Sequence, residues 1–282
     1  MRNHKILWLG ALALATPAFT NTSTVRRWSE PPVSTDQYES HPMFDPRSGD
    51  LYFVRSTPEF EHWKLLVSAC DRDGRRGEPE PPPFASPAAA EADPFFTRDG
   101  GTFYFISTRS VNGEAKSDLD IWRVHRDRSG VWAAPEHLPA PVNSDKQEWF
   151  PRLAADGWLY FGSGREGGLG RTDIWRAKEV GGVWRVENLG REINTAGDEF
   201  EPELSANGKH LLLMADDDLY GSRLEHGRWT LREKLGPEVN TANMEVGSYL
   251  SPDARSFLFS RDGEIYQYGS SAQNFPPHCR RR

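Results

Sequence analysis

One motif recurs five times along the 282-residue chain and limits the folds open to it. Each copy opens on a glutamate, and it continues through a tight turn, an aromatic or leucine-rich run and an acidic–X–aromatic triplet. The copies lie 46 to 57 residues apart and begin at Glu39, Glu91, Glu148, Glu199 and Glu245. Apolar and polar residues alternate over short runs, and no helical period is sustained. Such a unit cannot bury its faces alone, so the copies must pack against one another.

The number of strands in each copy indicates the architecture. The triplet begins with Glu61, Asp120, Asp173, Asp218 or Glu264, and a further strand follows around Trp132, Trp184 and Trp229. Four strands in a repeat of about 40–50 residues are typical of a propeller blade. We therefore predict an all-β fold, a five-bladed β-propeller of four-stranded antiparallel blades that begin near residues 39, 91, 148, 199 and 245.

The two ends of the repeat region are incomplete in complementary ways. The segment 32–36 precedes Glu39 at the offset at which "PVNSD" precedes Glu148, so it resembles the end of a fourth strand. The last copy has three strands and stops near Tyr268. We therefore predict that Trp28 to Val33 pairs with Ile265 to Tyr268, which closes the ring without an open edge. Five prolines in "GEPEPPPFASPAAAEAD" predict a short or absent outer strand in the first blade.

The strings "YFGSGREGGLGRTDIW" and "NLGREINTAGDEFEPELSANG" resemble the TolB-like propeller repeat, a WD-repeat-like unit of bacterial envelope proteins. The resemblance extends from about Val33 to Tyr268. It implies a propeller fold and a periplasmic setting. It says little about activity, because such repeats serve scaffolds, receptors and a few enzymes.

The remaining segments bear on location and partners. Residues 1–20 have a basic start, an apolar run and small residues before a cleavage point, as a signal peptide does. The apolar run is too short to span a membrane, and the net charge of −7 disfavours nucleic acid. We expect a monomeric periplasmic or secreted protein with one propeller domain over residues 21–268, a tail over 269–282 and no cofactor.

Two sets of residues are predicted to be structural. Cys70 and Cys279 are the only cysteines, and in an oxidising compartment they favour a disulfide, with two unrelated thiols as the alternative. An arginine closes the second strand in four copies, and a carboxylate follows it closely in sequence. We predict that the turns are fixed by charge-assisted pairs between these arginines and carboxylates; the residues concerned are Arg55, Arg109, Arg165, Arg261, Asp120, Asp173 and Asp218.

No specific catalytic motif or metal-ligand spacing is present in the sequence. The five repeated glutamates each precede an innermost strand, so a closed ring brings them towards one mouth of its axis. We predict a binding surface there, formed by Glu39, Glu91, Glu148, Glu199, Glu245, His41, Trp149 and Phe200. The favoured function is a non-catalytic scaffold that binds an envelope protein or polymer. The alternative is a glycan-active enzyme, a glycoside hydrolase or lyase, that uses carboxylates at the mouth.

Overall fold

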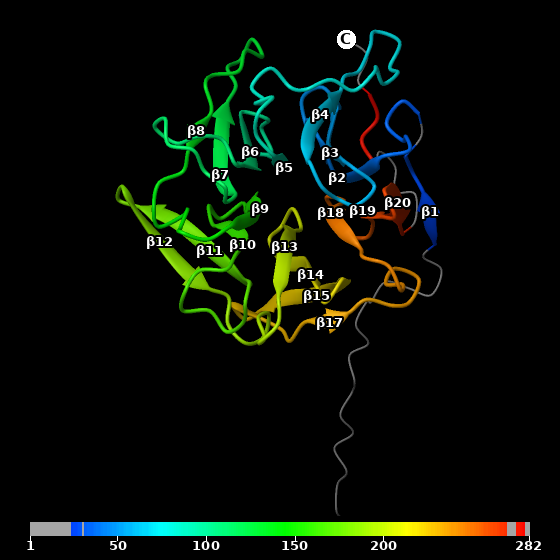
Figure 1. Cartoon of the computed structure of the whole chain (residues 1–282). Coiled ribbons are helices and arrows are strands. Elements are labelled where there is room, and N and C mark those ends of the chain that lie inside the picture. Colours follow the sequence, from blue (N-terminus) through cyan, green and yellow to red (C-terminus); the bar gives the residue numbers. More distant parts are fainter. Residues whose placement is uncertain (1–23, 30, 270–274, 280–282) are drawn as a thin grey trace, which may run out of the picture.

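Five antiparallel sheets stand in a ring around a central axis, as Figure 1 shows for the computed structural model. The structure describes residues 24–29, 31–269 and 275–279. Within these ranges the chain contains strands, turns and loops and no helix, so no described helix could cross a membrane. The predicted all-β, five-bladed propeller is confirmed. The predicted signal peptide, residues 1–20, lies outside the described residues.

The first two blades follow the predicted order from the axis outwards. Blade one consists of β2 (Tyr38–Phe44), β3 (Leu51–Ser56) and β4 (Lys64–Ser68). Blade two consists of β5 (Glu91–Phe96), β6 (Thr102–Ser107), β7 (Asp120–His125) and β8 (Glu136–His137). In blade one two isolated bridges, Val67 with Glu80 and Cys70 with Arg76, stand where a fourth strand would be, in line with the prolines of that segment.

The other three blades repeat the pattern. Blade three consists of β9 (Glu148–Leu153), β10 (Leu159–Ser163), β11 (Asp173–Val180) and β12 (Val183–Asn188). Blade four consists of β13 (Glu199–Leu204), β14 (His210–Ala215), β15 (Asp218–Glu225), and two short outer strands, β16 (Arg228–Trp229) and β17 (Glu233–Lys234). Blade five consists of β18 (Val246–Leu250), β19 (Phe257–Arg261), β20 (Glu264–Tyr268) and β1 (Val25–Arg27).

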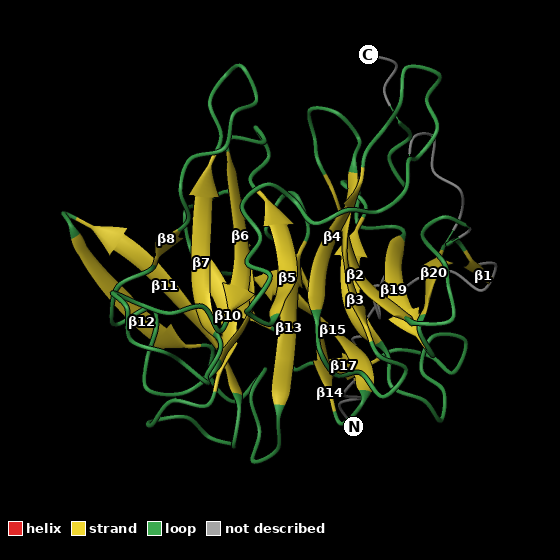
Figure 2. Cartoon of the chain, turned by 45° about the horizontal axis from the view of Figure 1, so that its top comes forward, coloured by secondary structure: helices red, strands yellow, loops and turns green. Residues whose placement is uncertain are grey.

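Aromatic and aliphatic side chains fill the gaps between neighbouring blades. Figure 2 shows the strands of the blades packed around the axis with loops at both ends. Tyr52 of blade one lies 5.0 Å from Phe96 and 5.2 Å from Phe103 of blade two, measured between ring centroids. Similar buried clusters join the other neighbours. This explains how a chain of low hydrophobic content forms a fold, because its many aromatic residues serve several thin interfaces rather than one thick core.

The ring closes because β1 pairs with β20, and the residues that pair differ from those predicted. β1 pairs with β20 through Val25 with Tyr268 and Arg27 with Tyr266. The backbone N–H groups of Trp28 and Ser29 both donate to the carbonyl of Ile265. The closing strand is therefore Val25–Arg27, and Trp28 begins the connection to blade one. The position of residues 32–36 relative to Glu39 therefore located the end of this connection and not the closing strand.

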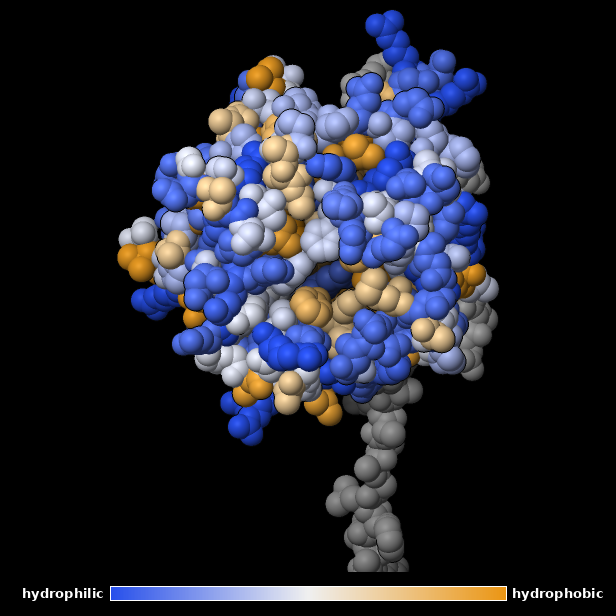
Figure 3. Space-filling model, viewed as in Figure 1, coloured by the Kyte–Doolittle hydropathy of each residue, from blue (hydrophilic) through white to orange (hydrophobic). Residues whose placement is uncertain are grey.

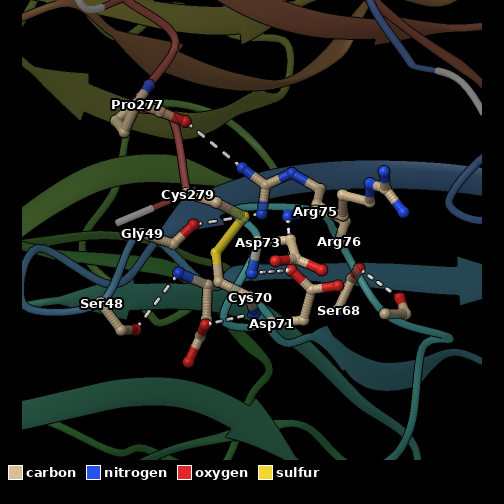
Figure 4. Close-up of a disulfide and its surroundings, with 12 residues drawn as sticks. Ser48, Gly49, Ser68, Cys70, Asp71, Asp73, Arg75, Arg76, Pro277 and Cys279 are labelled. Atoms are coloured by element: carbon tan, nitrogen blue, oxygen red, sulfur yellow. Dashed lines mark hydrogen bonds between the residues drawn. A yellow bond between two sulfur atoms is a disulfide. The ribbon is translucent and has the colours of Figure 1, made fainter. Parts of the chain in front are cut away.

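A disulfide joins the tail to blade one next to this seam. Cys70 and Cys279 are bonded, with their Cα atoms 5.4 Å apart. Figure 4 shows Arg76 beside the disulfide, where its guanidinium donates to the carbonyl oxygens of Gly49 and Pro277. The tail is thus held to the outer part of blade one by one covalent link and one arginine.

Candidate functional site

Every innermost strand bulges at the second residue after its repeated glutamate. The pairing register shifts at this point in all five inner strands. A bulge inserts one unpaired residue and turns its side chain away from the alternating pattern. The bulged residues have a positive φ of 52–68°, and they are His41, Asp93, Phe150, Glu201 and Gly247. Non-glycine residues in this conformation carry strain, which often marks a functional site.

The five bulges form one hydrogen-bonded network on the axis. His41 Nε2 lies 3.0 Å from Glu201 Oε1 and 3.3 Å from Asp93 Oδ1. The other oxygen of Asp93 accepts from the Phe150 N–H at 2.7 Å, and the other oxygen of Glu201 accepts from the Gly247 N–H at 2.6 Å. Three blades therefore supply ionisable side chains, and two supply backbone donors that hold the carboxylates in place.

Glycine is required at the fifth bulge. A Cβ atom on Gly247 would lie 2.6 Å from the backbone nitrogen of His41 and 2.8 Å from its Cα. Real Cβ atoms do not approach backbone so closely, and the positive φ adds a second penalty for other residues. The residue type at 247 thus allows His41 to reach the axis.

The network has unusual protonation properties because it is buried. Burial by itself would lower the pKa of His41, but the charges of Glu201 and Asp93 outweigh it and raise the pKa. Burial raises the pKa of Asp93; Glu201 adds to this effect and His41 opposes it. The two acidic side chains therefore favour the charged form of the imidazole, and burial favours the protonated form of Asp93.

A cavity of about 220 Å³ lies over this network. Figure 3 shows the centre of the ring hollowed on the face viewed there. Three groups of the network form its polar lining, and the remaining walls are mostly apolar. The lining residues are His41, Val54, Phe60, Trp63, Ala92, Asp93, Trp149, Phe200, Glu201, Met214, Met244 and Val246. An apolar pocket with a few convergent ionisable groups of perturbed pKa is the usual form of a ligand or active site.

A second buried ion pair joins the inner strands β9 and β13. Arg152 Nε donates to Glu203 Oε2 at 2.6 Å, and the backbone N–H of Leu250 donates to the other oxygen at 3.1 Å. Both side chains are at most 5 % exposed. The Arg152 guanidinium also lies over the ring of Phe150, 3.5 Å from its centroid. The positive charge of Arg152 is therefore satisfied by Glu203 rather than by the cavity.

The structure divides the predicted binding residues into two groups. His41, Trp149 and Phe200 line the cavity. The five repeated glutamates do not, because each is buried beside its blade and is at most 2 % exposed. The predicted binding residues that do not line the cavity are Glu39, Glu91, Glu148, Glu199 and Glu245.

Glu148 shows what these glutamates do. It accepts from the backbone N–H and the hydroxyl of Ser144, at 3.2 and 2.5 Å, and from the hydroxyl of Ser163 at 2.9 Å. Arg165 completes the set at 3.0 Å. Burial raises the pKa of Glu148, although Ser144 and Arg165 favour its ionised form. Each repeated glutamate thus ties an inner strand to the loop before it.

The arginines predicted to be structural have different partners from those expected. Each pairs with the repeated glutamate of its own blade, and the pairs are Arg55–Glu39, Arg109–Glu91, Arg165–Glu148 and Arg261–Glu245. In blade four, where the second strand lacks an arginine, Arg232 supplies the pair to Glu199. Pairing in an antiparallel sheet explains this, since the end of a second strand lies beside the start of the first.

The carboxylates before the aromatic residues bind other groups. Asp120 pairs with Lys116 and His137, and Asp218 pairs with Lys234. Asp173 accepts from the backbone N–H groups of Leu169 and Gly170, at 2.7 and 2.8 Å. They fix local turns, as a structural role requires, but not through the arginines.

Asp93 and Glu201 were not among the predicted site residues. Both occupy the position two residues after a repeated glutamate, where the other copies carry His41, Phe150 and Gly247. The variety at this position was the available signal, because a framework residue recurs in type whereas a site residue differs between blades. Across the part of the chain that the structure describes, no group of three or more His, Cys, Asp or Glu residues is arranged to hold a metal ion.

Comparison with solved structures finds the same fold in enzymes. A protein assigned as a gluconolactonase shares 14 % identity with this chain, covers 90 % of it and 94 % of its own length, and gives a TM-score of 0.50. A carbohydrate-active enzyme of family AA12 from Trichoderma reesei shares 10 %, with coverages of 89 % and 97 % and a TM-score of 0.51. The PQQ domain of pyranose dehydrogenase from Coprinopsis cinerea shares 10 %, with coverages of 89 % and 96 % and a TM-score of 0.50.

This chain is a β-propeller. At these identities the similarity establishes the fold alone. No protein-family model and no curated protein matches the chain, so the propeller is confirmed while the TolB-like family is not.

The expectation of a non-catalytic scaffold is corrected by these findings. The similar structures bear the names of enzymes, and the axis carries ionisable groups at the lining of a cavity. The alternative expectation, an enzyme that uses carboxylates near the axis, agrees better with both observations, although the carboxylates concerned are Asp93 and Glu201.

Proposed function

We propose that this protein is an enzyme that hydrolyses a C–O bond in a small, sugar-derived substrate by general acid–base catalysis. The observation that carries the proposal is the pair of carboxylates, Asp93 and Glu201, on one imidazole nitrogen of His41 in an apolar cavity. Two carboxyl groups in different protonation states are what such a hydrolysis needs.

The environment suggests a role for each group. Asp93, whose pKa is raised by burial, is the proposed acid that protonates the leaving oxygen. Glu201 is the proposed base that accepts a proton from the attacking water. The water oxygen bonds to the substrate carbon as the C–O bond breaks, so one water is consumed for each bond cleaved. His41 is a positioning residue, because it contacts both carboxylates and sets their charge.

The size and walls of the cavity support a single small ring as substrate. A volume of about 220 Å³ is below the usual range of about 300–1,000 Å³ for drug-sized ligands. Trp149 and Phe200 are half-buried at the mouth and offer flat apolar faces to a ring. The names of the similar structures, a gluconolactonase, a carbohydrate-active enzyme and a pyranose dehydrogenase, all concern sugars.

A panel of aryl glycosides and sugar lactones tests the proposal. We expect turnover of at least one member, and a loss of roughly 10²–10⁴-fold in kcat/KM on Asp93→Asn or Glu201→Gln. The matched control is Asp99→Asn, which alters an exposed carboxylate in the turn after β5 that does not line the cavity. Full activity in both site variants, or no turnover of any panel member by the folded wild-type protein, would overturn the proposal.

We also propose a periplasmic or extracellular location. The pattern of residues 1–20 and the Cys70–Cys279 disulfide both support an oxidising compartment. Cell fractionation of a native-length, C-terminally tagged protein tests this, and recovery in the cytoplasm would contradict it.

A further inference from the structure

The walls of the cavity contain a continuous series of aromatic rings. Phe60 lies 5.5 Å from Trp63, Trp63 lies 5.8 Å from Trp149, and Trp149 lies 6.1 Å from Phe200, measured between ring centroids. The three interplanar angles are 56°, 74° and 90°. Successive rings are therefore steeply inclined to one another, and together they supply an aromatic lining of the kind that encloses organic cations.

The other lining groups also suit a cation. Met214 and Met244 contribute polarisable thioethers, and Asp93 and Glu201 contribute two carboxylates. The described residues that line the cavity include no Lys or Arg. The imidazole of His41 is the one basic side chain among them, and it lies against two carboxyl groups.

Nearby arginines do not add an unpaired positive charge to the cavity. Arg152, the closest in the axis, is bound by Glu203 at 2.6 Å. The arginines around the ring are each bound by a repeated glutamate, as in the Arg165–Glu148 pair at 3.0 Å. The arginines that surround the cavity are thus paired locally, so a cationic ligand at its floor would be balanced by the carboxylate of Glu201 and by ionisation of Asp93.

We propose that the cavity selects ligands that carry an organic ammonium group, of the amino-sugar class if the proposed function is right. The ammonium would lie against the aromatic wall, above Asp93 and Glu201. The same surface disfavours acidic sugars, because a uronate carboxylate would meet two carboxylates and the negative faces of the rings. This inference concerns selectivity of the site and rests on the proposed function only for the sugar part.

A proton is expected to leave the site when such a ligand binds. Asp93 is in contact with His41 and the Phe150 N–H, and Glu201 and Arg152 are the other charged groups that act on it. Because burial and Glu201 raise the pKa of Asp93, a cation placed beside it would favour release of its proton. The heat of binding should then depend on the ionisation enthalpy of the buffer.

Isothermal titration of the wild-type protein with glucosamine, glucose and glucuronate near neutral pH tests the proposal. We expect glucosamine to bind roughly tenfold or more tightly than glucose, and glucuronate to bind least. Choline and its uncharged isostere 3,3-dimethylbutan-1-ol separate charge from sugar recognition, and choline should bind more tightly. Equal affinity within both pairs, or preferred binding of glucuronate, would overturn the proposal.

Variants locate the effect in the cavity. Trp149→Leu and Glu201→Gln should each weaken glucosamine binding more than glucose binding. Trp158→Leu is the matched control, because Trp158 is half-buried and stacks on Arg176 outside the cavity. Ammonium selectivity without hydrolysis would leave this inference standing and remove the proposed function. Hydrolysis without any preference for ammonium ligands would support the proposed function and overturn this inference.

Discussion

The imidazole of His41 lies 3.0 Å from the carboxylate of Glu201, although 160 residues separate them in the chain. His41 belongs to blade one and Glu201 to blade four, and each occupies the bulge of its inner strand. The contact exists because two bulges turn these side chains to the same point on the axis. Closure of the ring is therefore a condition for the site as well as for the fold.

The raised pKa of His41 predicts how stability depends on pH. A histidine whose folded pKa exceeds its unfolded value of about 6.5 stabilises the protein below that pH, and this contribution is lost as pH rises through the folded pKa. We expect the free energy of unfolding to fall from about pH 6.5 upwards. Urea unfolding of the wild-type protein and His41→Gln across this range should show the fall in the wild type and a flatter curve in the variant.

The control for this prediction is His125→Gln. His125 is 46 % exposed in its side chain and contacts the Thr102 hydroxyl on the outside of blade two. Its replacement should leave the wild-type pH dependence in place. If His41→Gln and the wild type give parallel curves, the buried imidazole is not charged in the folded protein.

The Arg152–Glu203 pair predicts a large loss of stability from a single substitution. Removing one partner of a buried ion pair leaves an uncompensated charge, at a cost of about 3–5 kcal/mol. Arg152→Met should lose about this much in urea unfolding, whereas Arg152→Met with Glu203→Leu should recover most of it. Arg176→Met breaks a half-exposed pair with Glu187 and should cost less than about 1 kcal/mol. A double variant no more stable than the single one would contradict this view of the pair.

The repeated glutamates predict an effect on stability without an effect on the cavity. Glu148→Gln keeps the size of the side chain but weakens four hydrogen bonds, so we expect a loss of about 1–3 kcal/mol in the free energy of unfolding. Binding of a cavity ligand should be unchanged. Glu187→Gln, on an exposed strand, is the control and should lose little. Weakened ligand binding at unchanged stability would show instead that Glu148 takes part in ligand binding.

The sequence predicted the blades well because their signal repeats. Each Glu, turn and aromatic run occurs in every copy, so an error in one copy is corrected by the others. The partners of the arginines were harder to predict, since Arg165 is nearer in sequence to Asp173 than to Glu148, and only the pairing of the strands brings it to Glu148. Cross-strand register depends on bulges, and a bulge leaves little trace in residue type.

The site was predicted only in part for a related reason. His41, Trp149 and Phe200 were predicted at the mouth as exposed residues of the loops between blades, and they line the cavity, although His41 is buried. Asp93 and Glu201 line the cavity too, but charged residues in a short strand ordinarily face solvent. Their burial follows from the left-handed backbone of each bulge, with φ of 57° at both residues. That conformation could not be anticipated from an alternating polar–apolar pattern.

The disulfide predicts how far the tail and the ring depend on one another. The bond joins residues 209 positions apart, so in the chain-entropy model it stabilises the fold by up to about 5 kcal/mol. Cys70→Ser with Cys279→Ser should lose a substantial part of that amount in urea unfolding, and a reductant should destabilise the wild type to the same level. The double variant should not respond to the reductant, which makes it its own control. Neither cysteine lines the cavity, so ligand affinity should survive in the variant. A wild type that melts identically with and without reductant, with free thiols confirmed by alkylation, would show that the disulfide contributes nothing to the ring.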